Sequence, residues 1–333
     1  MKYLFPITYL FGTLALCVLL ASALVGAALI AGRRRLARLE PSAQSRIALA
    51  AAVAPAFLGA VFVGGASYDR LLYGPADFCL HLQVSATPSL ILLLSVAILA
   101  GRVLTYGIQT IVVIIRAVRL SLVLSGASYK AFMGCLVLPV EEPQAYVLGV
   151  LNPRVYVSQG LLEQSNEDDL APVLAHERAH AARRDPLRRL IASAGLVLHL
   201  PGIAHLLNRL LTRTQEMAAD ADAARTVGDR VRVAEALVRF ARLQASSSGC
   251  DCRWRKVAEA LVRFARLQGP VRAAAMKFGS GDLEARVREL LDPRQRRGLS
   301  AVALVGCSAA LCLLALFAAH GLHYLAQALL RLP

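Results

Sequence analysis

Two histidines, separated by three residues and with a glutamate directly after the first, are the residues of this sequence best suited to chemistry. They are His176, Glu177 and His180. In a helix, side chains four positions apart lie on one face, so both imidazoles can bind a single metal ion. Zinc suits these ligands, and Glu177 is placed to act as a general base without binding the metal itself. The motif therefore predicts a zinc site that hydrolyses peptide bonds.

A catalytic zinc site also needs a third protein ligand. A metzincin would have a glycine and a third histidine where this chain has Arg183 and Pro186, so that class is excluded. We expect Glu216 to be the third ligand, because its helix would return antiparallel beside the histidine helix. Asp220, one turn later, would accept a hydrogen bond from a ligand imidazole and fix its tautomer.

His199 and His205 are alternatives for the third ligand. Both have apolar neighbours, which is more typical of a histidine satisfied within a core or at a membrane interface. Solvated histidines on a surface helix would be the non-catalytic explanation of the motif. Against it, Leu170, Val173 and Leu174 give the same helix an apolar face.

The motif lies in a region, residues 121–297, whose charged residues, proline-containing turns and short β-type runs predict a folded α+β domain. Tyr146–Leu151 and Val155–Ser158 are β-prone and predict a hairpin. The second of these strands would pair with the backbone of an extended substrate. The motif helix is expected to begin at a capping residue, either Ser165 or Asp168.

The composition predicts a membrane protein. Of the 333 residues, 57% are hydrophobic and 18% are charged, and the mean hydropathy is +0.55, which is too apolar for an ordinary soluble domain. A bilayer is crossed by roughly 20 apolar residues of helix. Four predicted spans cover residues 4–30, 47–66, 90–115 and 299–319. A further apolar run, residues 187–200, is too short and predicts a buried or membrane-skimming helix.

The arginines predict how these spans are oriented. Arg33, Arg34 and Arg35 follow the first span, which is typical of its cytoplasmic end. By alternation, a polar loop at 67–89 lies outside. We therefore expect a mainly α, multi-pass protein of the inner (cytoplasmic) membrane. It is divided into residues 1–120 with three spans, a cytoplasmic zinc metalloprotease domain at 121–297, and a final span with a short tail at 298–333.

Three other features carry less functional information. The net charge of +15 does not predict nucleic-acid binding, because the arginines gather beside the apolar runs. The seven cysteines form no disulfide framework, and Cys250 and Cys252 are interpreted as an incidental exposed pair. The segment VAEALVRFARLQ occurs at 233–244 and again at 257–268. We interpret this repeat as a local duplication in a surface helical hairpin rather than a partner site.

The sequence resembles the BlaR and MecR type of membrane metallopeptidase, the antirepressor family. The resemblance rests on Asn152-Pro153-Arg154-Val155-Tyr156-Val157-Ser158, on His176-Glu177-Arg178-Ala179-His180 with Arg184-Asp185, and on Glu216 with Asp220. Three predicted spans before the protease region and one after it match that family's layout. The resemblance implies a cytoplasmic gluzincin domain, zinc bound by His176, His180 and Glu216, catalysis by Glu177, and a role in signal-triggered proteolysis.

The implied partners are the lipid bilayer and a protein or peptide substrate, either a transcriptional repressor or a membrane protein. No direct nucleic-acid binding is expected, and a homodimer is left open. The best-known members carry an extracellular penicillin-binding sensor after the last span, which this sequence does not contain, so β-lactam sensing is not expected. Similar motifs occur in quality-control and prenyl-protein-processing membrane peptidases, which are the alternative. A second alternative is a non-enzymatic protein, either a membrane scaffold or a signal transducer, that keeps a relic metal site.

Overall fold

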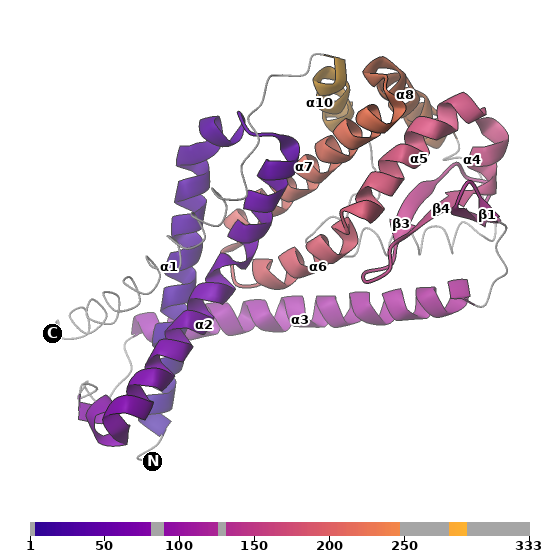
Figure 1. The fold of residues 1–333 in the computed structure, drawn as a ribbon. Coiled ribbons are helices and arrows are strands. Elements are labelled where there is room, and N and C mark those ends of the chain that lie inside the picture. Colours follow the sequence, from indigo (N-terminus) through magenta and orange to yellow (C-terminus); the bar gives the residue numbers. More distant parts are fainter. Residues whose placement is uncertain (1–3, 81–89, 126–130, 247–279, 292–333) are drawn as a thin grey trace.

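A computed structural model describes residues 4–80, 90–125, 131–246 and 280–291. The described chain is mainly helical with one small sheet (Figure 1). The predicted last span, Cys250, Cys252 and the second copy of the repeat lie outside the described residues. The helices are α1 (Leu4–Leu36), α2 (Pro41–Leu80), α3 (Leu90–Ser125), α4 (Gln159–Gln164), α5 (Glu167–Ala182), α6 (Asp185–Leu196), α7 (Pro201–Val227), α8 (Arg230–Ser246) and α10 (Ser280–Leu291).

Two helices at the N-terminal end contain segments that are long and apolar enough to cross a membrane. These segments are Phe11–Leu36 in α1 and Pro41–Val61 in α2. In α3, Leu93–Ile108 forms a further apolar helical segment among the residues whose side chains are described. The structure therefore supports two of the three N-terminal spans that the sequence predicts, and the third stays a prediction.

The segment expected to be an external loop is helical over most of its length. Helix α2 continues to Leu80, although the apolar run ends at Ala66. Helical backbone satisfies its own hydrogen bonds, so a helix can continue beyond an apolar run without a change of fold. The prediction of a loop beginning at Ser67 is therefore wrong.

Arg102 interrupts the apolar run of α3 because it contacts the end of another helix. Its Nε donates to the carbonyl of Val197 at 3.0 Å, and a terminal nitrogen donates to the carbonyl of Leu196 at 2.9 Å. The guanidinium also lies 4.5 Å from the centre of the Tyr106 ring. The last carbonyls of a helix lack partners within it, so Arg102 caps α6 and attaches α3 to it.

The sheet has four strands in the order β1-β2-β4-β3. They are β1 (Ala131–Phe132), β2 (Cys135–Leu138), β3 (Ala145–Leu148) and β4 (Arg154–Ser158). The predicted hairpin is confirmed, since β3 pairs antiparallel with β4. However, β4 also pairs with β2, in parallel, so both of its edges are occupied. The prediction that this strand binds substrate backbone is therefore wrong, and β3 is the edge strand instead.

The hairpin turn depends on Gly149, which has a φ of 106° and therefore lies in the region that favours glycine. A Cβ atom at this position would lie 2.3 Å from the carbonyl oxygen of Asn152. We expect Gly149→Ala to lower the free energy of unfolding by about 1–3 kcal/mol, measured by denaturant titration in detergent. Gly202→Ala is the control, because no atom lies within 4 Å of its added Cβ. Equal stability of the two variants would contradict the prediction.

Helix α5, which carries the motif, begins at neither predicted cap. Its N-cap is Asn166, whose side chain accepts a hydrogen bond from the backbone N–H of Asp169 at 2.8 Å. Pro172 lies inside the helix and cannot donate to the carbonyl of Asp168. Arg232 donates to that carbonyl at 3.2 Å instead. The side chain from α8 therefore replaces the backbone donor that the proline lacks.

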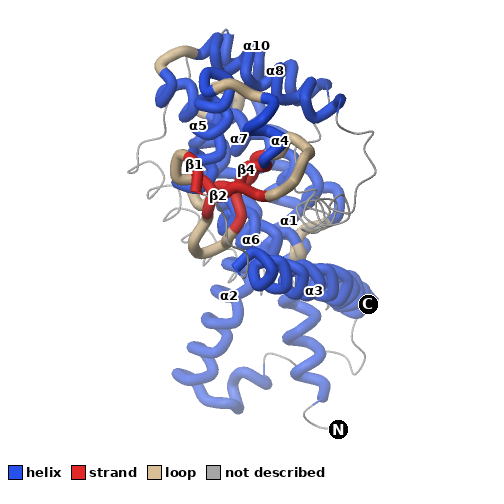
Figure 2. The backbone as a smooth tube through the Cα atoms, turned by 90° about the vertical axis from the view of Figure 1, so that its right-hand side faces the viewer, coloured by secondary structure: helices blue, strands red, loops and turns tan. Residues whose placement is uncertain are grey.

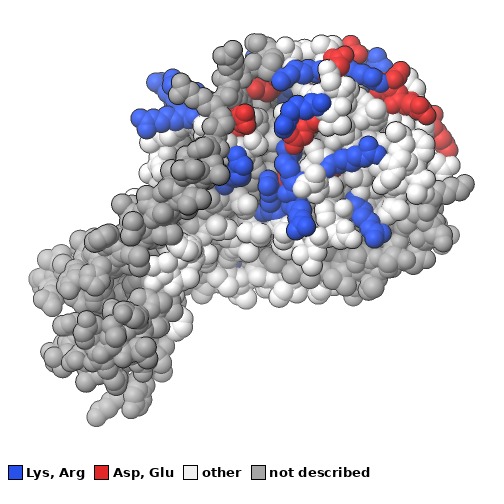
Figure 3. Space-filling view, viewed as in Figure 1, with Lys and Arg blue, Asp and Glu red and all other residues white. Residues whose placement is uncertain are grey.

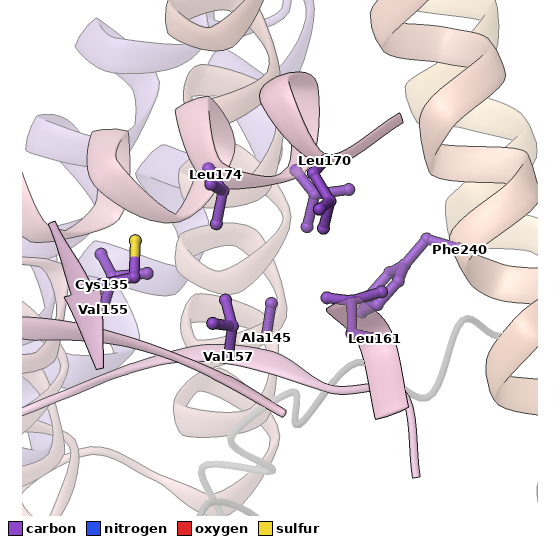
Figure 4. Packing of buried hydrophobic residues seen from close by; sticks show 9 residues of the cluster. Cys135, Ala145, Val155, Val157, Leu161, Leu170, Leu174 and Phe240 are labelled. Carbon is purple, nitrogen blue, oxygen red and sulfur yellow. The ribbon is translucent and has the colours of Figure 1, made fainter. Parts of the chain in front are cut away.

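One face of α5 packs on the sheet. In Figure 4, Leu170 and Leu174 point from the helix toward Val157 and Ala145 of the strands. Phe240 of α8 reaches the same cluster. The first copy of the repeat therefore lies in α8 and contributes to the core, with Phe240 only 3% exposed. Figure 2 shows the sheet between α8 and α10 at one end and α3 at the other.

Helices α6 and α7 pack on the pair formed by α1 and α2, which we call the membrane hairpin. Ala192 and Leu196 of α6 and Leu207 of α7 form one buried cluster with Ala48 and Ala52 of α2. The apolar run at 187–200, predicted to be a buried or membrane-skimming helix, is helical in α6 as far as Leu196, and its Ala192 and Leu196 pack on α2. The domain that carries the motif is therefore packed directly against the hairpin.

Candidate metal centre

The two motif histidines and Glu216 converge, as the sequence predicts. Helices α5 and α7 lie side by side (Figure 1), and the three side chains are all buried. One ligand atom from each lies within 4.8 Å of the others. Among the described residues, His176, His180 and Glu216 are the group of side chains that could together bind a metal ion.

The distances between these atoms suit a tetrahedral zinc ion. The two Nε2 atoms of His176 and His180 are 3.1 Å apart. A carboxylate oxygen of Glu216 lies 3.5 Å from the first and the other oxygen lies 3.6 Å from the second. Two atoms at about 2.0–2.1 Å from one tetrahedral zinc are about 3.3–3.4 Å apart. Oε2 of Glu216 is also buried without a hydrogen-bond partner among the described residues, which fits a metal ligand.

A carboxylate lies behind each imidazole, close to its Nδ1 atom. Nδ1 of His176 lies 2.9 Å from Oδ1 of Asp220, and Nδ1 of His180 lies 2.7 Å from Oδ2 of Asp185. Because a carboxylate can only accept, both protons belong on Nδ1. When each imidazole is neutral, the lone pair of its Nε2 then faces the space between the ligands, which is the tautomer that binds a metal.

The position of Asp185 depends on the turn after α5. Arg184 adopts a left-handed conformation with a φ of 52°, which is uncommon for a residue other than glycine. The turn starts α6 with Asp185 and Pro186, and proline is favoured in the first turn of a helix. Asp185 is thereby buried against His180, with 1% of its surface exposed.

Two arginines reach the carboxylates of α7 from different helices. Arg189 of α6 donates to Oε1 of Glu216 at 3.1 Å and to the side chain of Gln215 at 2.8 Å. Arg286 of α10 donates to both oxygens of Asp220, at 2.6 and 2.7 Å. One of its terminal nitrogens is 3.5 Å from Oε2 of Glu216. Sequence reasoning missed both arginines, since nothing in their neighbourhoods distinguishes them from the other basic residues.

The buried charges shift the pKa values of these groups in the protein without metal. Burial alone would raise the pKa of Asp220, but Arg286 lowers it to about 2. Burial would also raise the pKa of Glu216, but His180, His176 and Arg286 hold it well below its usual range. For His180, burial opposes the positive charge, yet Glu216 and Asp185 raise its pKa to about 9. The site therefore favours positive charge at the point where the ligands meet.

Glu177 is the motif residue without a binding partner. It is 5% exposed, and its carboxylate forms no hydrogen bond or ion pair with the described residues. It lies next to His176 on the same helix and close enough to His180 and Arg286 to influence their charge. This freedom suits a general base.

The alternative histidines lie elsewhere. Nε2 of His199 lies 3.1 and 3.2 Å from the carbonyls of Ala51 and Ala52, and the Ser22 hydroxyl lies 3.1 Å from Nδ1. It is a satisfied buried histidine at the contact between α6, α7 and the membrane hairpin. His205 is exposed on α7. Neither is in the group that could bind a metal.

A comparison with protein families identifies the family. The model of peptidase family M48 matches residues 114–293, which is more than half of the 333-residue chain. The chain belongs to peptidase family M48. The matched range includes every residue of the metal centre described above. For this M48 protein, the zinc-metalloprotease character predicted from the motif agrees with the family; the narrower BlaR and MecR type is not specifically supported.

Curated relatives of this M48 protein are similar over part of their length. A protease HtpX homolog of Acidiphilium cryptum (strain JF-5) is 31% identical over 139 residues, which cover 31% of this chain and 48% of the relative. A homolog of the same name from Desulfatibacillum aliphaticivorans is 30% identical over 143 residues. The aligned region covers 31% of this chain and 46% of that relative. The chain therefore spans about half the length of these relatives. No solved structure matches it.

Proposed function

We propose that this M48 protein is a membrane-embedded zinc endopeptidase that cleaves protein substrates on the cytoplasmic side of the membrane. The observation that carries the proposal is the convergence of His176, His180 and Glu216, with the Glu177 carboxylate free beside them. Glu177 and the three ligands would together form a gluzincin-type site. The two apolar helices and the membrane-associated family support a location in the bilayer.

The charge distribution supports the cytoplasmic orientation. Helix α1 ends with Arg33, Arg34 and Arg35 in its last turn. The helix rises beside α7, where a Cβ on Gly26 would lie 2.7 Å from the side chain of Ile203 (Figure 1). The basic end of the span is thus on the side of the protease helices, and the described charged side chains on the face shown in Figure 3 lie over that part of the molecule. Basic ends of spans are retained in the cytoplasm.

The residues present would supply the remaining steps of hydrolysis. When bound, zinc would act as a Lewis acid on the scissile carbonyl and lower the pKa of an attacking water. Glu177 would accept the proton of that water and deliver it to the leaving amine. Asp220 and Asp185 would keep the two imidazoles in the orientation that binds the metal.

An extended substrate would bind along β3. This strand is at the edge of the sheet and lies against α5, which carries the motif. Within the described residues no strand pairs with its outer edge, and strand addition binds a peptide mainly through the backbone. The other edge strand, β1, has only two residues. The proposal therefore includes substrates selected by extended conformation more than by sequence.

Signal-responsive cleavage of a repressor is the narrower form of the proposal. It is supported by the resemblance of the central motifs to the BlaR and MecR type. The same motifs lie inside the range matched by family M48, so they are equally compatible with a quality-control or processing protease. Cleavage products in membranes separate the two roles. One cytoplasmic protein cleaved only after a stimulus supports the first, and many misfolded membrane proteins cleaved without one support the second.

We expect cleavage of a denatured protein substrate by the purified full chain to stop when a chelator removes zinc. Activity should return when zinc is added back, because the ligands remain in the folded protein. The measurement is the rate of appearance of new peptide ends, together with the zinc content of the same sample. A Glu177→Gln preparation controls for contaminating proteases. Cleavage that continues at full rate after chelation would contradict the proposal.

A further inference from the structure

We propose that Arg286 of α10 is a positioning residue of the metal centre, acting through Asp220. The inference rests on the proposed zinc site and extends it to a helix outside the motif. Arg286 is 5% exposed and lies 66 positions from Asp220 in the sequence. A buried guanidinium is expensive unless its charge is paired, so its position against the ligand helix requires an explanation.

Arg286 fixes the plane of the Asp220 carboxylate. Its Nε donates to Oδ2 at 2.7 Å and a terminal nitrogen donates to Oδ1 at 2.6 Å. Two parallel bonds from a rigid guanidinium set both the position and the rotation of a carboxylate. A single point charge such as a lysine ammonium would set only the position.

The fixed carboxylate in turn orients a ligand. Oδ1 of Asp220, which accepts from Arg286, is also the oxygen that lies 2.9 Å from Nδ1 of His176. Rotation of the carboxylate would move this oxygen away from the imidazole. The third guanidinium nitrogen, 3.5 Å from Oε2 of Glu216, reaches a second ligand from the same side. Arg286 thus controls the geometry of two of the three ligands without touching the space between them.

Helix α10 is held in place by the first copy of the repeat. Leu290 of α10 is 3% exposed and packs with Val233, Ala234 and Leu237 of α8 in one cluster. Leu283 and Val287 pack against the same cluster. The apolar face of this copy therefore positions the arginine, which is a role that the sequence alone did not indicate.

The test compares Arg286→Gln with Arg288→Gln, a matched change of an exposed arginine on the same helix. We expect Arg286→Gln to weaken zinc affinity by about 10–100-fold, measured by competition with a chelator, because loss of such supporting contacts has that effect on metal sites. Visible absorption of the cobalt-substituted protein should also change, since it reports ligand geometry. Arg286→Lys should recover only part of the affinity. Arg288→Gln should match wild type in both measurements.

A double variant separates positioning from folding. In an Asp220→Asn background, Arg286→Gln should weaken zinc affinity by much less than in wild type, because its route to His176 is already lost. Full additivity, or wild-type affinity and cobalt spectrum in Arg286→Gln, would overturn the inference. If circular dichroism shows that Arg286→Gln does not fold, the test uses Arg286→Lys instead. Wild-type zinc affinity and a wild-type cobalt spectrum in Arg286→Lys would then overturn the inference. Failure of the wild-type chain to bind zinc would instead overturn the proposed function.

Discussion

Replacing Glu177 by glutamine should lower the rate of peptide hydrolysis by about 10²–10⁴-fold, the usual contribution of a general base. Glutamine has the same shape but cannot accept the proton of the attacking water. The zinc content should equal that of wild type, because Glu177 is not in the group that converges as ligands. The measurement is kcat on a peptide substrate, with zinc quantified in the same preparation.

Glu167→Gln is the matched control for this change. Glu167 is an exposed glutamate in the first turn of the same helix. Its replacement removes the same charge from α5 without affecting the site, so kcat should remain that of wild type. A Glu177→Gln variant that cleaves at the wild-type rate with normal zinc content would exclude Glu177 as the base.

Replacing His180 by alanine should abolish hydrolysis and weaken zinc affinity by more than about 100-fold. Loss of a residue that only hydrogen-bonds a metal ligand weakens metal affinity by about 10–100-fold. His180 is expected to bind the ion directly, so its loss should have a larger effect. The loss also leaves Asp185, which is 1% exposed, without its 2.7 Å contact to Nδ1. Zinc affinity is measured by competition with a chelator of known affinity.

His205→Ala is the control, because His205 is an exposed histidine on α7 outside the metal centre. It should bind zinc and cleave substrate like wild type. If His180→Ala retained wild-type zinc affinity, the ion would have to be bound elsewhere, and the assignment of the three ligands would be wrong.

The convergence of the three candidate ligands was predictable because helical spacing fixes much of it locally. His176 and His180 lie one turn apart, and Glu216 and Asp220 lie one turn apart on a helix with its own apolar periodicity. Only the antiparallel return of α7 beside α5 had to be assumed. The structure has this return, with Nδ1 of His176 2.9 Å from Asp220.

The remaining features depend on contacts between distant segments. Arg286 has no local signal, since an arginine in an amphipathic helix is more often exposed than buried. Which edge of β4 is free depends on the parallel pairing with β2, and the sequence of β4 does not contain this information. These two features are decided by tertiary packing rather than by spacing. The start of α5 is different, because it is a local choice among neighbouring capping residues, and Asn166 makes the capping hydrogen bond.

Helix α6 links the ligands to the membrane hairpin without a flexible joint. Its first residue, Asp185, contacts His180, and Arg189 contacts Glu216. Near its other end, a Cβ on Gly195 would lie 2.2 Å from the carbonyl oxygen of Ala52 in α2, so the two backbones are in direct contact. The 12 residues of the helix span about 18 Å. An axial shift of α2 would therefore be transmitted along this helix to Asp185 and Arg189, which contact His180 and Glu216.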